Sequence, residues 1–180
     1  MSFIIPLALI AGIIGFGWWY AMRQNGGLSG APVATQVFLP AAATKTSGCK
    51  ISGKYPDTAC TPGKIISGIT KDRVCTAGYT QSVSGISNAA AAEIYSSYGI
   101  ARHAAGQYVI DRLVPLSLGG SNDPANLWPE SASPKPGYHE KDLAEAYLVR
   151  QVCAGSVSLA DAQREIDKDW YSVYSQSLIN

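Results

Sequence analysis

The sequence predicts a small α+β domain preceded by an N-terminal transmembrane helix. Three observations carry this prediction: an uncharged apolar segment at the start, two β-rich stretches separated by a glycine-rich loop, and two helical patterns at the end. The 180 residues suit one modest domain with an appendage. A net charge of +1 with 15% charged residues excludes a histone-like or polybasic nucleic-acid binder, because global charge supplies almost no attraction to phosphate.

The first segment has the length and composition of a membrane anchor. Residues 3–22 are predominantly apolar and carry no charged side chain. As a helix with a rise of about 1.5 Å per residue they span about 30 Å, the thickness of a bilayer's hydrocarbon core. Trp18, Trp19 and Tyr20 end the segment, where amphipathic rings favour the headgroup region. We predict a transmembrane helix or signal-anchor over residues 1–23.

A cleaved signal peptide is the alternative for this segment. Against it, the start of the chain has no Lys or Arg and the apolar run is longer than usual. Residues 24–46 follow; they are rich in Gly, Ala, Pro and Thr and lack helical periodicity. This composition predicts a flexible linker, which leaves residues 47–180 as the folded domain.

All four cysteines lie in the predicted domain, and no two of them form a CxxC pair, so a zinc-ribbon site is not predicted. An even number suits two disulfides, with three pairings open. We favour Cys49–Cys60, which closes a short Pro/Gly-containing loop, and Cys75–Cys153, which ties the front of the domain to a late helix. Disulfides predict a single-pass protein whose domain lies outside the cytoplasm. The alternative is four reduced thiols in a domain on the cytoplasmic side of the membrane. Arg23, directly after the apolar segment, weakly favours this orientation.

The middle of the domain predicts short elements separated by turns. Residues 60–80 are broken by Pro-Gly and Gly signals and predict irregular structure with one short strand at most. Residues 87–98 are Ala-rich, begin at a serine and predict a helix. Residues 107–113 are β-branched and aromatic and predict a strand. The turn formers of residues 118–126 predict a loop, and residues 127–130 a second, very short strand.

The end of the domain predicts two helices. The first covers residues 137–153 and ends at Gly155. Its predicted apolar face consists of Leu143, Tyr147, Leu148 and Val152. Ser158, with Asp161 three residues later, begins the second helix in the manner of a capping box. Its predicted apolar face consists of Leu159, Ala162, Ile166, Trp170 and Val173. The solvated face is predicted to carry Glu165, Asp167 and Asp169.

Four polar residues are placed so that they can meet. Asp111 and Arg112 end the predicted strand, Asn126 ends the loop, and His139 opens a helix. A carboxylate and an imidazole can hold a divalent metal with open water positions, and such a metal polarises a phosphodiester. Taken singly, these residues have structural explanations as a strand-end turn former, a salt-bridge partner, a loop Asn and a surface His.

Two stretches carry a family resemblance: YVIDRLVPLSLGGSNDPANLWPE and YHEKDLAEAYLVRQVCAGSVSLADAQREIDKDW. They resemble the HNH endonucleases, the ββα-metal nucleases, and in particular a bacterial branch with an Asp-His-Leu-x-Pro-Leu-x-Leu-Gly-Gly-Ser-Asn core and an Asn-Leu-Trp-Pro segment. CTPG and CTAGYT resemble the front half of that branch, so the resemblance covers residues 60–170. It implies an HNH-like ββα-metal core with flanking helices. It also implies a hydrolase that cleaves phosphodiester bonds of nucleic acid, with DNA expected as the substrate rather than RNA.

The resemblance also implies roles for the four polar residues. Asp111 and His139 would bind the metal, with Mg²⁺ or Mn²⁺ expected and Zn²⁺ as an alternative. Asn126 would orient the general base and brace the loop. The general base of the family is a His where this chain has Arg112. A guanidinium with a pKa above about 12 cannot accept a proton from water, although it can bind phosphate or stabilise developing negative charge. The charged helical stretch that follows in the family is matched by Lys141, Asp142 and Glu145.

Two functions therefore remain open. The first is a membrane-anchored, metal-dependent HNH-type endonuclease in which Arg112 contacts the scissile phosphate; losing a general base costs about 10²–10⁴ in rate, which a slow enzyme tolerates. The second is a degenerate, catalytically inactive HNH-fold module that has a binding or structural role on a membrane. His103, the other histidine, is expected to face solvent in a loop rather than replace the base. Trp128 and Trp170 are expected in the core.

Overall fold

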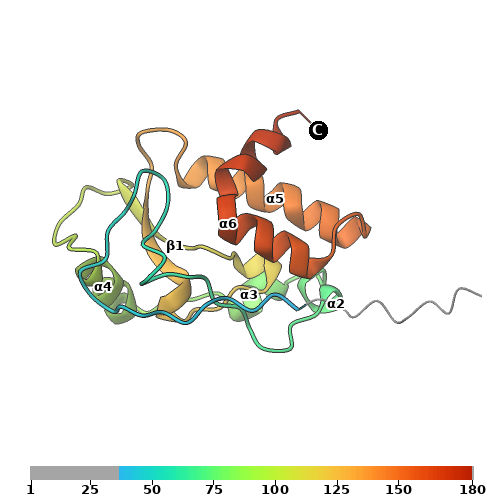
Figure 1. Cartoon of the computed structure of the whole chain (residues 1–180), viewed down its shortest axis with the longest axis horizontal. Coiled ribbons are helices and arrows are strands. Elements are labelled where there is room, and N and C mark those ends of the chain that lie inside the picture. The colour runs from blue at the N-terminus through green and yellow to red at the C-terminus, as the bar shows by residue number, and fades with distance from the viewer. Residues whose placement is uncertain (1–36, 180) are drawn as a thin grey trace, which may run out of the picture. The chain divides into compact units, whose positions relative to one another are not determined.

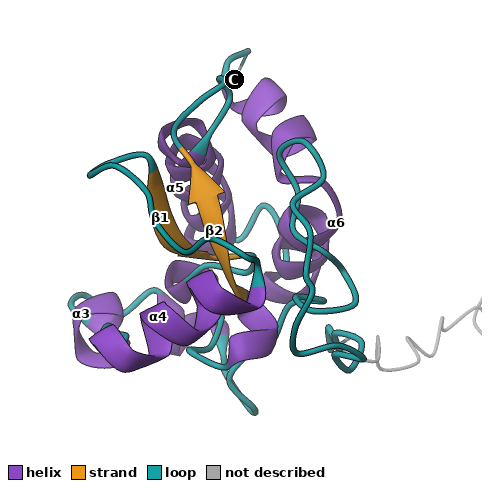
Figure 2. Cartoon of the chain, turned by 90° about the vertical axis from the view of Figure 1, so that its left-hand side faces the viewer, coloured by secondary structure: helices purple, strands orange, loops and turns teal. Residues whose placement is uncertain are grey.

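The computed structural model of the chain describes residues 37–179, which form a mixed α+β unit (Figure 1). Helices α5 (Tyr138–Ala154) and α6 (Leu159–Ser177) pack side by side, and α4 (Asn88–Ser97) lies on the other side of a β-hairpin (Figure 2). The predicted α+β class is confirmed. The predicted membrane segment, residues 3–22, lies outside the described residues. Within residues 37–179, no helix combines the length and apolarity that crossing a bilayer requires.

The hairpin is a two-stranded antiparallel sheet. Strands β1 (Tyr108–Arg112) and β2 (Leu127–Ser131) pair with Asp111 opposite Trp128. Directly opposed residues share a face of a sheet, and so do residues two apart along a strand. Asp111, Trp128 and Glu130 therefore lie on one face. Both strands were predicted, within a residue or two of their ends.

Stretches predicted as loops or irregular structure contain short helical turns. The connection between the strands holds two 3-10 turns, η1 (Leu116–Leu118) and η2 (Pro124–Asn126). Residues 60–80 contain α2 (Lys71–Val74) and the start of α3 (Tyr79–Val83), and one isolated β-bridge to the glycine-rich loop. Helices of four and five residues are too short to show an apolar periodicity, so the sequence pattern could not reveal them.

The three longer helices begin close to their predicted positions, and α4 and α5 also end close to them. Ser87 caps α4 and Ser158 caps α6, each accepting a hydrogen bond from the backbone N–H three residues later. Gly155 ends α5 with a left-handed φ of 83°. One detail of the predicted apolar face of α5 is wrong, because Leu143 is 52% exposed. The apolar residues of α5 that are buried are Ala144, Leu148 and Val152.

Two apolar clusters stabilise the unit. The larger cluster packs α5 and α6 against η1 and against Phe38, Val74 and Tyr79, and Trp170 is fully buried within it. The smaller packs α4 against the hairpin around Trp128, which is 1% exposed. Both tryptophans are thus core residues, as predicted. Phe38, within the predicted linker 24–46, is buried in the larger cluster, so packed structure begins before residue 47.

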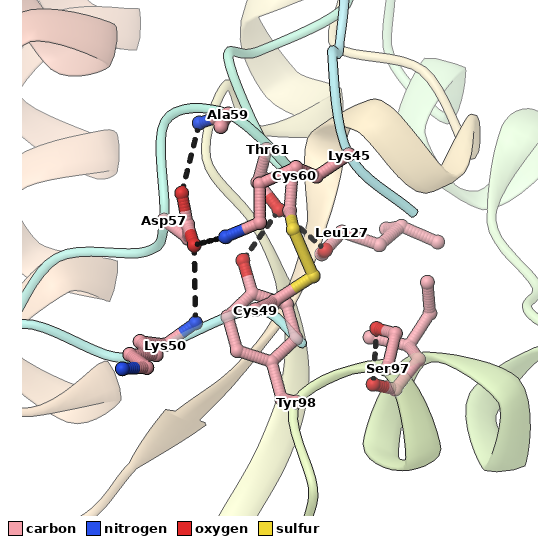
Figure 3. Close-up of a disulfide and its surroundings, with 11 residues drawn as sticks. Lys45, Cys49, Lys50, Asp57, Ala59, Cys60, Thr61, Ser97, Tyr98 and Leu127 are labelled. Atoms are coloured by element: carbon pink, nitrogen blue, oxygen red, sulfur yellow. Dashed lines mark hydrogen bonds and ion pairs between the residues drawn. A yellow bond between two sulfur atoms is a disulfide. The ribbon is translucent and has the colours of Figure 1, made fainter. Parts of the chain in front are cut away.

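Both favoured disulfides are confirmed. Cys49–Cys60 lies beside a loop in which Asp57 accepts hydrogen bonds from the Lys45 ammonium and from the backbone N–H groups of Lys50 and Ala59 (Figure 3). Cys75–Cys153 joins the residue after α2 to the last turn of α5, across 78 positions of the chain. Closing a loop of that length stabilises the fold by about 4–5 kcal/mol in the chain-entropy account.

The acidic residues of α6 differ from the predicted solvated face. Glu165 is exposed, but Asp169 accepts a hydrogen bond of 2.5 Å from the hydroxyl of Tyr55. Asp169 also has non-helical φ and ψ and accepts a hydrogen bond from the backbone N–H of Ser172, so it caps the second half of the helix. Asp167 is half-buried, and its Oδ1 is buried without a hydrogen-bond partner among the described residues.

Candidate functional site

The carboxylate of Asp111 is paired with an internal ammonium group. The side chain of Lys141, on α5, is 1% exposed, and its Nζ lies 2.7 Å from Asp111 Oδ2. The same Nζ donates to Glu145 Oε1 at 2.5 Å and to the backbone oxygen of Arg112 at 2.7 Å. Lys141 therefore fastens α5 to the end of β1.

Local sequence explains how α5 presents this group. Lys141 and Glu145 are four residues apart and share a helix face. The helix begins after Gly137, whose N–H donates to the Glu140 carboxylate in a capping box. A side-chain carbon at Gly137 would lie 2.2 Å from the backbone oxygen of Ser131, so a glycine is required where the end of β2 passes close to the start of α5.

A second carboxyl group is buried beside this pair. Glu130 is 1% exposed, and neither of its carboxyl oxygens has a well-aligned hydrogen-bond partner among the described residues. Burial, followed by the charge of Asp111, raises the pKa of Glu130 to about 10. Burial raises the pKa of Glu145 to about 7, opposed by Lys141. Burial alone would lower the pKa of Lys141, but the surrounding carboxylates hold it above its usual value.

These shifts bring the buried charges of the cluster toward balance. The raised pKa of Lys141 favours its charged form, whereas the raised pKa values of Glu130 and Glu145 favour their neutral forms. A divalent cation bound to Asp111 would face a buried ammonium 2.7 Å from its ligand oxygen, where repulsion is weakly screened. Within residues 37–179, no three His, Cys, Asp or Glu side chains are grouped so that they could hold a metal. A divalent ion at Asp111 would therefore compete with the ammonium of Lys141 for this carboxylate.

Arg112 is directed to the glycine-rich loop. Its Nε donates to Asn122 Oδ1 at 2.8 Å. Asn122 in turn donates to the backbone oxygens of Val83 at 3.1 Å and Gly85 at 3.0 Å. Because neighbouring residues of a strand point to opposite faces, Arg112 lies on the face away from Asp111. It joins β1, the loop and the segment after α3.

Asn126 braces the loop with four hydrogen bonds from a fully buried side chain. Its Oδ1 accepts from the backbone N–H groups of Val114 at 2.9 Å and Lys64 at 3.3 Å. Its Nδ2 donates to the backbone oxygens of Val114 at 2.8 Å and Ser121 at 2.9 Å. A side-chain carbon at Gly120 would lie 1.7 Å from the Val114 oxygen, so the loop closes only with glycine there. The bracing implied for Asn126 agrees with these contacts.

The two histidines are both exposed. His139 lies in the first turn of α5, where its ring packs against that of Tyr138 with centroids 4.2 Å apart. No hydrogen bond or ion pair connects His139 to Asp111 in the described part of the chain. His103 faces solvent in a loop, as expected, 4.4 Å from the ring of Tyr95. Asp111 and Arg112 thus end β1, Asn126 ends η2 just before β2, and His139 lies in the first turn of α5, so all four residues lie on the predicted hairpin and helix.

Three residues of the site were not foreseen as functional: Lys141 as the partner of Asp111, Glu130 as a buried acid and Asn122 as the partner of Arg112. The spacing of Lys141 and Glu145 was visible but is typical of an exposed helical pair. Comparisons of the chain with protein-family models, with curated proteins and with solved structures found no match.

Proposed function

We propose that this chain is a catalytically inactive, HNH-like ββα module that is held on a membrane by its N-terminal segment. The observation that carries the proposal is the buried ion pair between Lys141 and Asp111, because an ammonium group takes up the charge that a metal would otherwise neutralise. A hairpin with a long loop braced by Asn126, followed by α5 against it, supports the ββα core.

Two requirements of phosphodiester hydrolysis are unmet. Arg112 stands where the resemblance places a general base, and guanidinium accepts no proton at working pH. Asp111, with its charge satisfied by Lys141, offers no strong ligand to a cation. Neither requirement is met by His139, which is exposed on the first turn of α5 and packs against Tyr138.

The module would then act by binding nucleic acid, with DNA favoured over RNA as the partner. Among described residues, Arg112 uses only its Nε for a side-chain hydrogen bond, so its terminal nitrogens are available to a phosphate oxygen. Asn122 links the guanidinium to the loop through this Nε. Since the net charge is only +1, the attraction would be local and lost at moderate salt.

A binding measurement tests this proposal. The full chain in detergent is titrated into fluorescein-labelled duplex DNA at low salt with EDTA, and anisotropy is recorded. We expect Arg112→Gln to weaken binding and Asn122→Ala, the matched control that releases the loop but keeps the guanidinium, to retain most of it. Equal loss in both variants would assign Arg112 a purely structural role, and absence of binding would refute nucleic acid as the partner.

A slow metal-dependent nuclease is the second candidate. The observation in its favour is that Asp111 keeps its strand-end position while Asn126 keeps all four contacts in the loop. In that case Asp111 and His139 would hold Mg²⁺ or Mn²⁺, and Lys141 would have to leave Asp111. Metal-dependent cleavage of the labelled DNA would favour this candidate.

A further inference from the structure

The two disulfides differ in their access to solvent. Cys49 and Cys60 are 5% and 6% exposed. They pack with Leu127 and Tyr98 in the smaller core, near the loop that contains Asp57 (Figure 3). Cys153 is exposed, and its partner Cys75 is half-buried. A thiol in solution can therefore reach the second bond far more easily than the first.

The accessible bond fastens one end of a defined segment. Cys75 follows α2 directly, and its disulfide ties residues 71–85 to the end of α5. The other end of this segment is held by the hydrogen bonds of Asn122 to the backbone oxygens of Val83 and Gly85. Within the segment, Val74 and Tyr79 are buried in the larger core. Breaking the disulfide would leave the segment held by the Asn122 hydrogen bonds and by its two buried side chains, so it would loosen without leaving the fold.

A nearby cation favours the chemistry of reduction. The ammonium of Lys71 lies 3.3 Å from the position that a side-chain carbon would take at Gly155, two residues after Cys153. Lys71 is also four residues before Cys75, on the same short helix and its cap. A positive charge near a cysteine stabilises its thiolate, which makes it a better leaving group in thiol–disulfide exchange.

We propose that Cys75–Cys153 is a reversible redox tether that sets how firmly residues 71–85 are held, whereas Cys49–Cys60 is a permanent structural bond. A thiolate of a dithiol reductant attacks Sγ of Cys153, the sulfur–sulfur bond breaks, and Cys75 leaves as a thiolate that takes up a proton. The second thiol of the reductant then attacks the mixed disulfide and releases Cys153 as a thiol. The reductant becomes a disulfide, and two electrons have passed to the protein.

Graded reduction of the full chain in detergent tests the proposal. The protein is exposed to dithiothreitol, quenched with an alkylating reagent at intervals, and each cysteine is quantified by peptide mass spectrometry. Cys75 and Cys153 should be alkylated about tenfold or more faster than Cys49 and Cys60. Equal rates, or earlier labelling of Cys49 and Cys60, would overturn the assignment of the two bonds.

Hydrogen exchange of the same samples tests the effect on the segment. Amides of residues 71–85 should exchange faster once Cys75–Cys153 is reduced, while those of the hairpin stay protected. The variant Cys75→Ser/Cys153→Ser should reproduce this pattern without reductant, and Cys49→Ser, paired with the same change at Cys60, serves as the control. If a variant does not fold, exchange of the partly reduced natural protein decides; unchanged exchange in residues 71–85 would refute the tether.

Discussion

Replacing Lys141 with Met removes the ammonium group from the interior while keeping an unbranched apolar stem. Asp111 and Glu145 would then be left without their cation, and the backbone oxygen of Arg112 would lose its donor. Breaking a buried ion pair by removing one partner costs about 3–5 kcal/mol. The side chain of Lys141 is 1% exposed, so solvent cannot replace the lost partner, and we expect a loss of unfolding free energy in that range.

Urea unfolding at pH 7.5, followed by tryptophan fluorescence, measures this loss. The matched control is Lys135→Met, because Lys135 pairs with Glu140 at 3.2 Å but its side chain is 78% exposed. An exposed pair contributes about 0–1 kcal/mol, so the control should change little. Adding Glu145→Gln to Lys141→Met should recover part of the loss, since one stranded carboxylate disappears.

The reasoning would be refuted by a small effect. If Lys141→Met and Lys135→Met lose the same free energy, within about 1 kcal/mol of the natural protein, then Lys141 is not a buried counter-ion of Asp111. The argument that an ammonium neutralises the predicted metal ligand would fail with it. If adding Glu145→Gln to Lys141→Met lowers the unfolding free energy further, the charge balance described for the cluster would also be contradicted.

Two further changes test other buried polar groups. Burial raises the pKa of Asp167 from 3.8 to about 6. Between these two values the folded state binds more protons than the unfolded state, so the free energy of unfolding falls as the pH rises from about 4 to 6. Asp167→Asn should therefore gain about 1–3 kcal/mol at pH 8 and nothing at pH 3 in urea titrations, and an equal gain at both pH values would contradict this origin. Asn126→Ala should lose about 3–5 kcal/mol in the same measurement, because buried backbone groups lose their partners; a loss below about 1 kcal/mol would show that water replaces the side chain.

Much of the fold could be predicted because it depends on local signals. Serine caps at Ser87 and Ser158, a terminating Gly155 and β-branched runs each act within a few residues, and the structure has the corresponding helices and strands. The cysteine spacing also favoured both disulfides that are present. These features require no knowledge of which distant segments meet.

The remaining features depend on tertiary packing. The sequence pattern predicts Asp169 on a solvated acidic face, but its partner Tyr55 is 114 residues away in the chain. Leu143 has the right spacing for the core, yet the buried face of α5 is rotated toward Ala144 and Lys141. A helical lysine with a glutamate four residues later is typical of a surface, so the burial of Lys141 against Asp111 follows only from how the hairpin meets α5.

A plasmid-nicking assay tests the central claim most directly. The full chain in detergent is incubated with supercoiled plasmid in Mg²⁺, Mn²⁺ or EDTA, beside Arg112→His and His139→Ala. Because Lys141 neutralises Asp111, we expect no metal-dependent nicking by the natural protein, and none by Arg112→His, since restoring the base does not free the metal ligand. Metal-dependent nicking by the natural protein that disappears in His139→Ala would contradict the account and establish a nuclease that works without the usual base.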